Sequence, residues 1–333
     1  MSTLTEQIAE LLIVSYRGDH PPKEFLQFLE RHQVGGVIFF ADNAPTRKQL
    51  SASLDAIRAM YDIDHPPILG IDQEGGRVSR LADEASQFKT ASEYGFEHDT
   101  DAFIKDYQRV ATYLAELGLN LNFAPVTDLA LNPNNECLDG RCFSDDPDRA
   151  AELVAVSVQV AHRAGLLSCL KHFPGLGAAA IDPHYQATQA DYDLELWRSR
   201  ERIPIAAGLA AGADLVMTTH LKVPALDSEM ATASARVIGE LLRDDLEYDG
   251  PVVTDDLTMG GASPLGDYGA RAVTALQAGH DLLLFGQDQA APRKAIQAVE
   301  QAVRGGQLER NRIEQARRRV RNLKRHLWRR LVG

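Results

Sequence analysis

The sequence predicts a single domain with the (β/α)8-barrel fold, in which eight parallel strands alternate with helices. Short apolar runs rich in β-branched residues recur along the chain. Longer segments with helical spacing of apolar residues lie between them, a pattern typical of parallel strands joined by crossover helices. The chain has 333 residues, and such barrels typically use roughly 250 residues plus insertions. One domain over residues 1–333 is therefore sufficient.

Eight apolar runs are the expected strands, although the first of them could equally be the end of a helix. In chain order they are Leu11–Tyr16, Gly35–Phe40, Pro67–Asp72, Leu119–Ala124, Leu166–His172, Leu215–His220, Pro251–Asp255 and Asp281–Phe285. Helical spacing is clear over Asp146–Ala164 and Arg236–Leu246.

The chain is expected to close with a basic amphipathic helix over about residues 308–331. One apolar stripe at steps of three and four residues contains Ile313, Ala316, Val320, Leu323 and Leu327. From residue 301 onward there are 11 Lys and Arg but only two acidic residues. We interpret the segment as a closing helix with a solvated basic face; contact with a membrane surface or a partner is the alternative.

Composition narrows the class of partner. The net charge of −12 argues against general nucleic-acid binding, which depends on Lys and Arg, and favours a small-molecule or glycan partner. No apolar stretch approaches the roughly 18 residues of a membrane span, and we expect a monomer. Cys137, Cys142 and Cys169 form no C-x-x-C pair. Since the amino terminus also lacks the pattern of a secretory signal, we expect a cytoplasmic protein.

Ionisable residues gather where the predicted strands end. These residues are Asp72, Asp128, Lys171, His172, His220, Asp255 and Asp256. In a (β/α)8 barrel the carboxyl ends of the strands share one rim, which carries the chemistry of such enzymes. An Asp after a strand is also a common helix N-cap, and this structural role is the alternative hypothesis for Asp128 and Asp256.

The segment Lys171–His184 is expected to be a loop that carries a general acid/base. It contains two glycines and two prolines. Pro183 favours extended backbone at Asp182, and in extended chain the side chains at i and i+2 point the same way. Asp182 can therefore meet His184 and fix its tautomer, leaving the other ring nitrogen free to exchange a proton. A surface turn with an idle histidine is the alternative.

The same loop contains a loose dinucleotide-binding pattern, Gly175-x-Gly177-x-x-Ala180. That pattern must open a helix directly, whereas Pro183 interrupts any helix here. We therefore expect no nucleotide cofactor.

Six segments together resemble the signatures of family 3 glycoside hydrolases. They are Asp72–Arg80, Asn122–Asp128, Gly140–Phe143, Lys171–Gly175, Met217–His220 and Val253–Met259. The resemblance runs from about residue 8 to the last helix. It is closest to the single-domain bacterial β-N-acetylhexosaminidases of peptidoglycan recycling.

The resemblance implies roles for the matching residues. Asp255 would be the nucleophile, His184 the acid/base and Asp182 its partner. The residues that would hold the sugar are Asp72, Arg80, Arg141, Lys171 and His172. The implied reaction is a retaining double displacement that removes terminal β-linked N-acetylglucosamine from a muropeptide or disaccharide. It needs no metal and no organic cofactor.

The loop departs from the commonest family pattern, Lys-His-Phe-Pro-Gly-His-Gly-Asp-Thr. Leu176, Ala178 and Ala179 replace its second His, its Asp and its Thr, and Pro183 stands where a small hydroxyl residue is usual. These changes leave the acid/base pair in place but put the anchoring of the loop in question.

Three other functions remain to be distinguished. A β-glucosidase of the same family usually takes its acid/base from a second domain, whereas here Asp182 and His184 supply one locally. A phosphorylase would use phosphate in place of water in the second step. A histidine acid/base makes this possible because it repels phosphate less than a carboxylate does. A non-catalytic glycan-binding barrel would bind sugar without covalent labelling of Asp255.

Overall fold

The computed structural model describes residues 2–62, 65–81, 83, 86–180 and 182–332. Its centre is a barrel of eight parallel strands. These are β1 (Leu12–Val14), β2 (Gly36–Phe39), β3 (Ile68–Ile71), β6 (Leu121–Asn122), β7 (Leu167–Phe173), β9 (Leu215–Thr218), β11 (Val252–Val253) and β12 (Leu283–Leu284). All eight predicted strands are confirmed. The first run is a strand that follows a short helix, α1 (Leu4–Ala9).

The strand order is β11-β9-β7-β6-β3-β2-β1-β12. A parallel bridge between Val253 and Leu282 joins the two outer strands and brings the barrel to closure. The carboxyl ends of all eight strands therefore meet at one rim, as the fold prediction requires.

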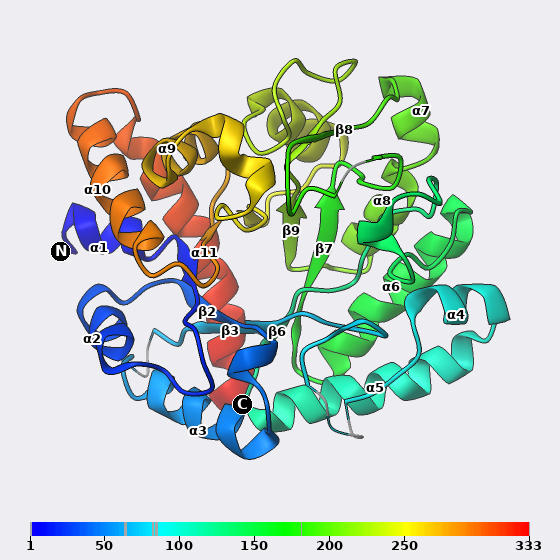
Figure 1. The fold of residues 1–333 in the computed structure, drawn as a ribbon, viewed down its shortest axis with the longest axis horizontal. Coiled ribbons are helices and arrows are strands. Elements are labelled where there is room, and N and C mark those ends of the chain that lie inside the picture. The colour runs from blue at the N-terminus through cyan, green and yellow to red at the C-terminus, as the bar shows by residue number, and fades with distance from the viewer. Residues whose placement is uncertain (1, 63–64, 82, 84–85, 181, 333) are drawn as a thin grey trace.

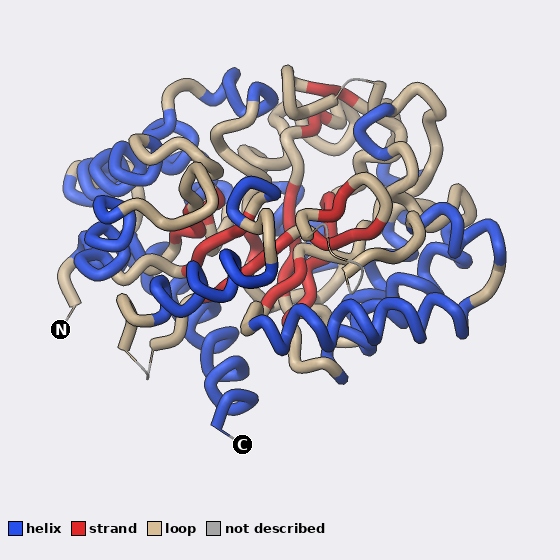
Figure 2. Tube along the Cα trace, turned by 60° about the horizontal axis from the view of Figure 1, so that its bottom comes forward, coloured by secondary structure: helices blue, strands red, loops and turns tan. Residues whose placement is uncertain are grey.

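Helices surround the strands (Figures 1 and 2). The longer ones are α2 (Lys23–His32), α3 (Arg47–Arg58), α5 (Thr100–Leu117), α6 (Pro147–Arg163), α8 (Arg202–Ala210), α9 (Tyr268–Ala278), α10 (Ala291–Arg304) and α11 (Arg310–Val332). Asp146 caps α6 and Pro147 occupies its first turn, which is why the sequence located this helix well. The predicted segment Arg236–Leu246 forms η3 (Val237–Asp245), which has π-helical hydrogen bonding.

Several shorter elements lie between the barrel strands and the longer helices in the chain. They are the helices α4 (Ala91–Glu97) and α7 (Leu194–Ser199), the 3-10 turns η1 (Ala41–Asn43), η2 (Glu136–Leu138) and η4 (Gly260–Leu265), and the two-stranded pairs β4 (Gln73–Gly75) with β5 (Val78–Ser79) and β8 (Thr188–Gln189) with β10 (Leu221–Lys222). No described helix is long and apolar enough to cross a membrane.

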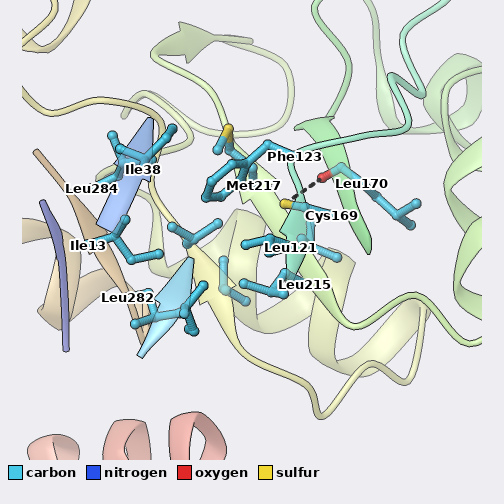
Figure 3. Close-up of a cluster of buried hydrophobic side chains, with 14 of the residues drawn as sticks. Ile13, Ile38, Leu121, Phe123, Cys169, Leu170, Leu215, Met217, Leu282 and Leu284 are labelled. Atoms are coloured by element: carbon cyan, nitrogen blue, oxygen red, sulfur yellow. Dashed lines mark hydrogen bonds between the residues drawn. The ribbon is translucent and has the colours of Figure 1, made fainter. Parts of the chain in front are cut away.

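Apolar side chains from opposite strands fill the barrel interior (Figure 3). Ile13, Leu121, Phe123 and Leu215 are fully buried. Gly70 of β3 leaves the space that the Phe123 ring occupies, since a Cβ there would lie 2.5 Å from the ring. The barrel is thus a packed core rather than a pore, and any ligand must bind above it, at the rim.

Helix α11 packs against α1 and α9 and buries its predicted apolar stripe. Much of its basic charge is paired: Arg317 and Arg321 bind Glu10, and Arg319 binds Asp249. Burial lowers the pKa of Lys324 to about 8. Arg310, Arg318, Arg321 and Arg325 are exposed, as a solvated basic face requires, whereas Arg317 and Lys324 are buried.

Candidate active site

A pocket of about 390 Å³ opens at the rim of the barrel. Its lining includes all eight residues proposed as the site from the sequence, namely Asp72, Arg80, Arg141, Lys171, His172, Asp182, His184 and Asp255. Asp72 directly follows β3, Lys171 and His172 lie near the end of β7, and Asp255 comes two residues after β11. Asp72 and Asp255, which are 183 positions apart in the sequence, thus share one cavity.

A buried cluster of alternating charges forms one wall of the pocket. The Lys171 Nζ lies 2.8 Å from Asp72 Oδ1 and 2.5 Å from Glu74 Oε1. Arg141 donates two hydrogen bonds to the Glu74 carboxylate, at 2.7 and 2.9 Å. The geometry is that of a bidentate arginine–carboxylate pair, which is strong and directional. Glu74 was missed in the sequence, although it lies only two residues after Asp72.

The charges of this cluster keep its acids ionised. Burial alone would raise the pKa of Glu74, but the Arg141 and Lys171 cations hold it well below its ordinary value. Burial likewise opposes ionisation of Asp72, and the attraction of Lys171 and Arg80 still lowers its pKa. The wall therefore presents a fixed carboxylate beside fixed cations, an arrangement suited to a ligand rich in hydroxyl groups.

Asp128 positions His172 and the start of the loop after β7. Its Oδ2 lies 2.6 Å from His172 Nδ1, and its Oδ1 accepts a hydrogen bond from the Leu176 backbone N at 2.6 Å. Asp128 is not the cap of any described helix, so the hypothesis that it is a helix N-cap was wrong. Its carboxylate instead fixes the orientation of the His172 ring at the edge of the pocket.

Asp256 holds the turn that presents Asp255. The Asp256 Oδ1 accepts hydrogen bonds from the backbone N of Thr258 and of Gly286, at 2.8 and 2.9 Å. Burial raises the pKa of this carboxyl. It, too, caps no described helix. Asp255 is half-buried, and its backbone N donates to Thr218 O at 3.0 Å, which fixes its place beside the end of β9.

Both ring nitrogens of the buried His220 are occupied by structural contacts. One lies 2.7 Å from Thr232 Oγ1 and the other 3.0 Å from the Asp256 carbonyl oxygen. Burial lowers the pKa of this imidazole. His220 therefore helps to fix the backbone of the Asp255–Asp256 turn.

The predicted pair of Asp182 and His184 is present. Asp182 Oδ1 lies 2.6 Å from His184 Nδ1 and also accepts a hydrogen bond from the His184 backbone N at 2.8 Å. Burial raises the pKa of Asp182, but these two hydrogen bonds outweigh it and the pKa is lowered. The carboxylate therefore stays charged and orients an imidazole whose side chain is 56% exposed.

The loop that carries this pair is held at both ends. At its far end the backbone N atoms of Gly260 and Gly261 donate to the carbonyl oxygens of His184 and Pro183, at 3.0 and 2.9 Å. A Cβ at either glycine would overlap this backbone. The loop thus rests directly on the segment that follows Asp255.

At its near end the loop is held through backbone carbonyls. The Asn135 side chain donates to Leu176 O and the Asn132 side chain to Ala179 O, each at 3.0 Å. Leu176 and Ala179 are buried. Two of the three substituted positions, Leu176 and Ala179, therefore pack as apolar residues, and the loop is anchored through its backbone carbonyls instead.

Cys137 lies beside the Asp182–His184 pair, a position that the sequence did not reveal. Its Sγ is 3.8 Å from His184 Nδ1, and it lines the pocket. Burial raises the pKa of this thiol to about 12. It is therefore a neutral thiol near neutral pH and not a thiolate nucleophile.

Comparison with known proteins places the chain in one family. Residues 3–323 match the model described as "Glycosyl hydrolase family 3 N terminal domain". The chain is 34% identical over 302 residues to the beta-hexosaminidase of Pseudomonas aeruginosa PAO1, covering 87% of this chain and 86% of that protein. It is 32% identical over 296 residues to the beta-hexosaminidase of Xanthomonas euvesicatoria, covering 87% of each.

Solved structures of two related enzymes have the same fold as this chain. The family 3 beta-N-acetylglucosaminidase of Paenibacillus sp. str. FPU-7 superposes with a TM-score of 0.94 at 30% identity, over 100% of this chain. The present chain spans only 64% of that protein. The beta-N-acetylhexosaminidase of Beutenbergia cavernae superposes with a TM-score of 0.89 at 25% identity, over 97% of this chain and 99% of that one.

Proposed function

Because the chain belongs to glycosyl hydrolase family 3 and is a glycoside hydrolase, we propose that it is a β-N-acetylhexosaminidase that removes one terminal β-linked N-acetylglucosamine with retention of configuration. The observation that carries the proposal is that Asp255 and the Asp182–His184 pair line one pocket. The name of the P. aeruginosa relative supports a hexosaminidase, and that of the Paenibacillus relative supports N-acetylglucosamine as the sugar.

In the first step the Asp255 carboxylate attacks the anomeric carbon. The bond from that carbon to the leaving oxygen breaks, and His184 protonates the departing oxygen through the nitrogen that does not face Asp182. The product is a glycosyl ester on Asp255.

In the second step water opens this ester. The same histidine, now neutral, removes a proton from the water, whose oxygen attacks the anomeric carbon on the face that the leaving group vacated. Asp182 keeps Nδ1 protonated and stabilises the imidazolium form, a role that its lowered pKa supports.

The charged wall binds the sugar. Asp72 and Arg80 line the pocket with partly exposed side chains, and we assign to them the hydrogen bonds to sugar hydroxyls. Lys171 and Arg141 lie deeper, where they contribute donors and hold Asp72 and Glu74 in place. His172, held by Asp128, completes the wall.

The natural substrate that we propose is a small peptidoglycan-derived fragment with a terminal N-acetylglucosamine. A pocket of about 390 Å³ suits one buried sugar ring rather than a long glycan, because ligand pockets of drug-sized molecules start at roughly 300 Å³. All three cysteines are free, which supports a reducing compartment such as the cytoplasm.

Hydrolysis of an aryl β-N-acetylglucosaminide by the parent, Asp255→Ala and His184→Ala proteins tests this function. We expect Asp255→Ala to abolish turnover. His184→Ala should lose roughly 10²- to 10⁴-fold on poor leaving groups and much less on those that need little protonation. Asp101→Ala, an exposed carboxylate on α5, is the control and should match the parent.

Equal turnover in all four proteins would remove both residues from the mechanism. Faster turnover of the parent with phosphate, giving a sugar phosphate, would reassign the second step to phosphorolysis. Preference for an aryl β-glucoside would reassign the sugar.

A further inference from the structure

Three side chains of different chemistry converge beside the pocket. The Cys137 Sγ, an Asp182 carboxylate oxygen and the His184 Nδ1 all lie within 4.8 Å of one another. Cys137 belongs to η2, whereas Asp182 and His184 come from the loop after β7. The cluster therefore joins two separate segments at the edge of the site.

This combination of ligand atoms matches zinc. Zn²⁺ binds cysteine sulfur at about 2.3 Å and histidine nitrogen or carboxylate oxygen at about 2.0–2.2 Å, usually with tetrahedral geometry. Two ligand atoms around such an ion lie roughly 3.2–3.7 Å apart. The 3.8 Å between Cys137 Sγ and His184 Nδ1 is already close to that spacing.

One distance is too short for a shared ion. Asp182 Oδ1 and His184 Nδ1 are 2.6 Å apart and would have to separate by roughly half an ångström or more to share an ion. His184 is more than half exposed, and Asp182 is 28% exposed. Solvent can therefore reach the cluster and supply the fourth ligand.

We propose that Cys137, Asp182 and His184 form a zinc-binding site that inhibits the enzyme. On binding, the thiol of Cys137 and the Nδ1 of His184 each release one proton to solvent. One thiolate and one carboxylate then balance the two positive charges of the ion. The Arg141 Nη1 donates to Cys137 Sγ at 3.6 Å, and its positive charge favours the thiolate form of this ligand, while Glu74 pairs with the same guanidinium.

The inhibition, unlike the binding, rests on the proposed function. With zinc on Nδ1, the imidazole loses the hydrogen bond to Asp182 and can no longer become the imidazolium that protonates a leaving group. Zinc would thus lower kcat without any contact with Asp255.

Binding is tested directly on the full chain with Co²⁺ as a spectroscopic probe for Zn²⁺. We expect a near-ultraviolet thiolate-to-cobalt charge-transfer band in the parent that is lost in Cys137→Ala and displaced by added Zn²⁺. Cys169→Ala, in which a cysteine buried in the barrel core is removed (Figure 3), is the matched control and should keep the band. A parent without the band, or a band that survives in Cys137→Ala, would overturn the site.

Inhibition is tested by zinc titration of aryl-glycoside hydrolysis, each variant being compared with its own rate in a chelator. Loss of an outer partner alone typically costs roughly 10- to 100-fold in metal affinity. Cys137→Ala should therefore raise the half-inhibitory zinc concentration by at least about tenfold, and Cys169→Ala should not. The same half-inhibitory concentration in all three proteins would refute the role of Cys137. If the parent shows no hydrolysis at all, the proposed function fails, but the cobalt spectrum still decides the metal site.

Discussion

At the scale of single residues, Glu74 connects the two deepest cations of the pocket. Its carboxylate accepts two hydrogen bonds from Arg141 and forms an ion pair with Lys171. Removing its charge would leave a buried arginine without its only bidentate acid in the described part of the chain. Such an uncompensated charge is far more costly than the loss of a surface pair.

We predict that Glu74→Gln lowers the free energy of unfolding by about 3–5 kcal/mol, measured by urea denaturation. Asp55→Asn, which breaks an exposed pair with Arg58, is the control and should cost less than about 1 kcal/mol. Similar small losses in both variants would mean that the cluster does not depend on Glu74.

Individual roles were harder to predict than positions. The sequence placed Asp128 and Asp256 at strand ends, but the partners that decide what they do are backbone N–H groups of distant segments, such as those of Leu176 and Gly286. A helix cap is recognisable because its partner is two or three residues away. A carboxylate that holds a loop 48 residues downstream has no such local signal.

At the scale of elements, the loop after β7 and the turn after β11 act as one unit. Gly260 and Gly261, in the turn after β11, allow its backbone to lie against the backbone of the loop after β7. This contact sets the position of His184 relative to Asp255 more directly than any side chain of the loop does.

We predict that Gly261→Ala lowers kcat by about 10²-fold, because a displacement of about 1 Å at a catalytic group can cost that much. The added methyl group would overlap the Pro183 carbonyl oxygen and push the loop away. Steady-state kinetics on the aryl glycoside measure this effect. Gly239→Ala, whose new Cβ would meet nothing within 4 Å, should keep the parent kcat. A parent-like kcat for Gly261→Ala would show that the contact does not position His184.

The strands were predictable because burial on both faces leaves continuous apolar runs. The pairs β4–β5 and β8–β10 escaped prediction because each strand is only two or three residues long and carries polar residues such as Gln73 and Gln189. The meeting of Asp182 with His184 was predictable from one local rule, the extended backbone before Pro183. The anchoring by Asn132 and Asn135 was not, since it depends on contacts between loops.

At the scale of the whole molecule, the barrel core contains a buried histidine that links folding to pH. His280 is fully buried, with one ring nitrogen 2.8 Å from Thr218 Oγ1 and the other 3.0 Å from the Ala275 carbonyl oxygen. Burial lowers its pKa to about 3 from the ordinary 6.5. Between about pH 6.5 and pH 3 the His280 imidazole is therefore protonated in the unfolded chain but neutral in the folded chain. The free energy of unfolding consequently decreases as the pH is lowered through this range.

We predict that the stability difference between the parent and His280→Gln narrows by roughly 2 kcal/mol between about pH 6 and about pH 4.5, since one proton is worth about 1.4 kcal/mol per pH unit. The variant lacks this titration and loses less stability on acidification. Urea denaturation at the two pH values gives the difference. A gap that stays constant would mean that His280 does not titrate with folding.

The proposed mechanism depends on the Asp255 carboxylate being the nucleophile that attacks the anomeric carbon. Incubation with a fluorinated N-acetylglucosamine analogue that slows opening of the glycosyl ester, followed by mass spectrometry of the digested protein, tests this most directly. The account predicts a single glycosyl adduct on the peptide that contains Asp255, absent from Asp255→Ala. An adduct on another carboxylate, or sugar binding with no adduct, would contradict it.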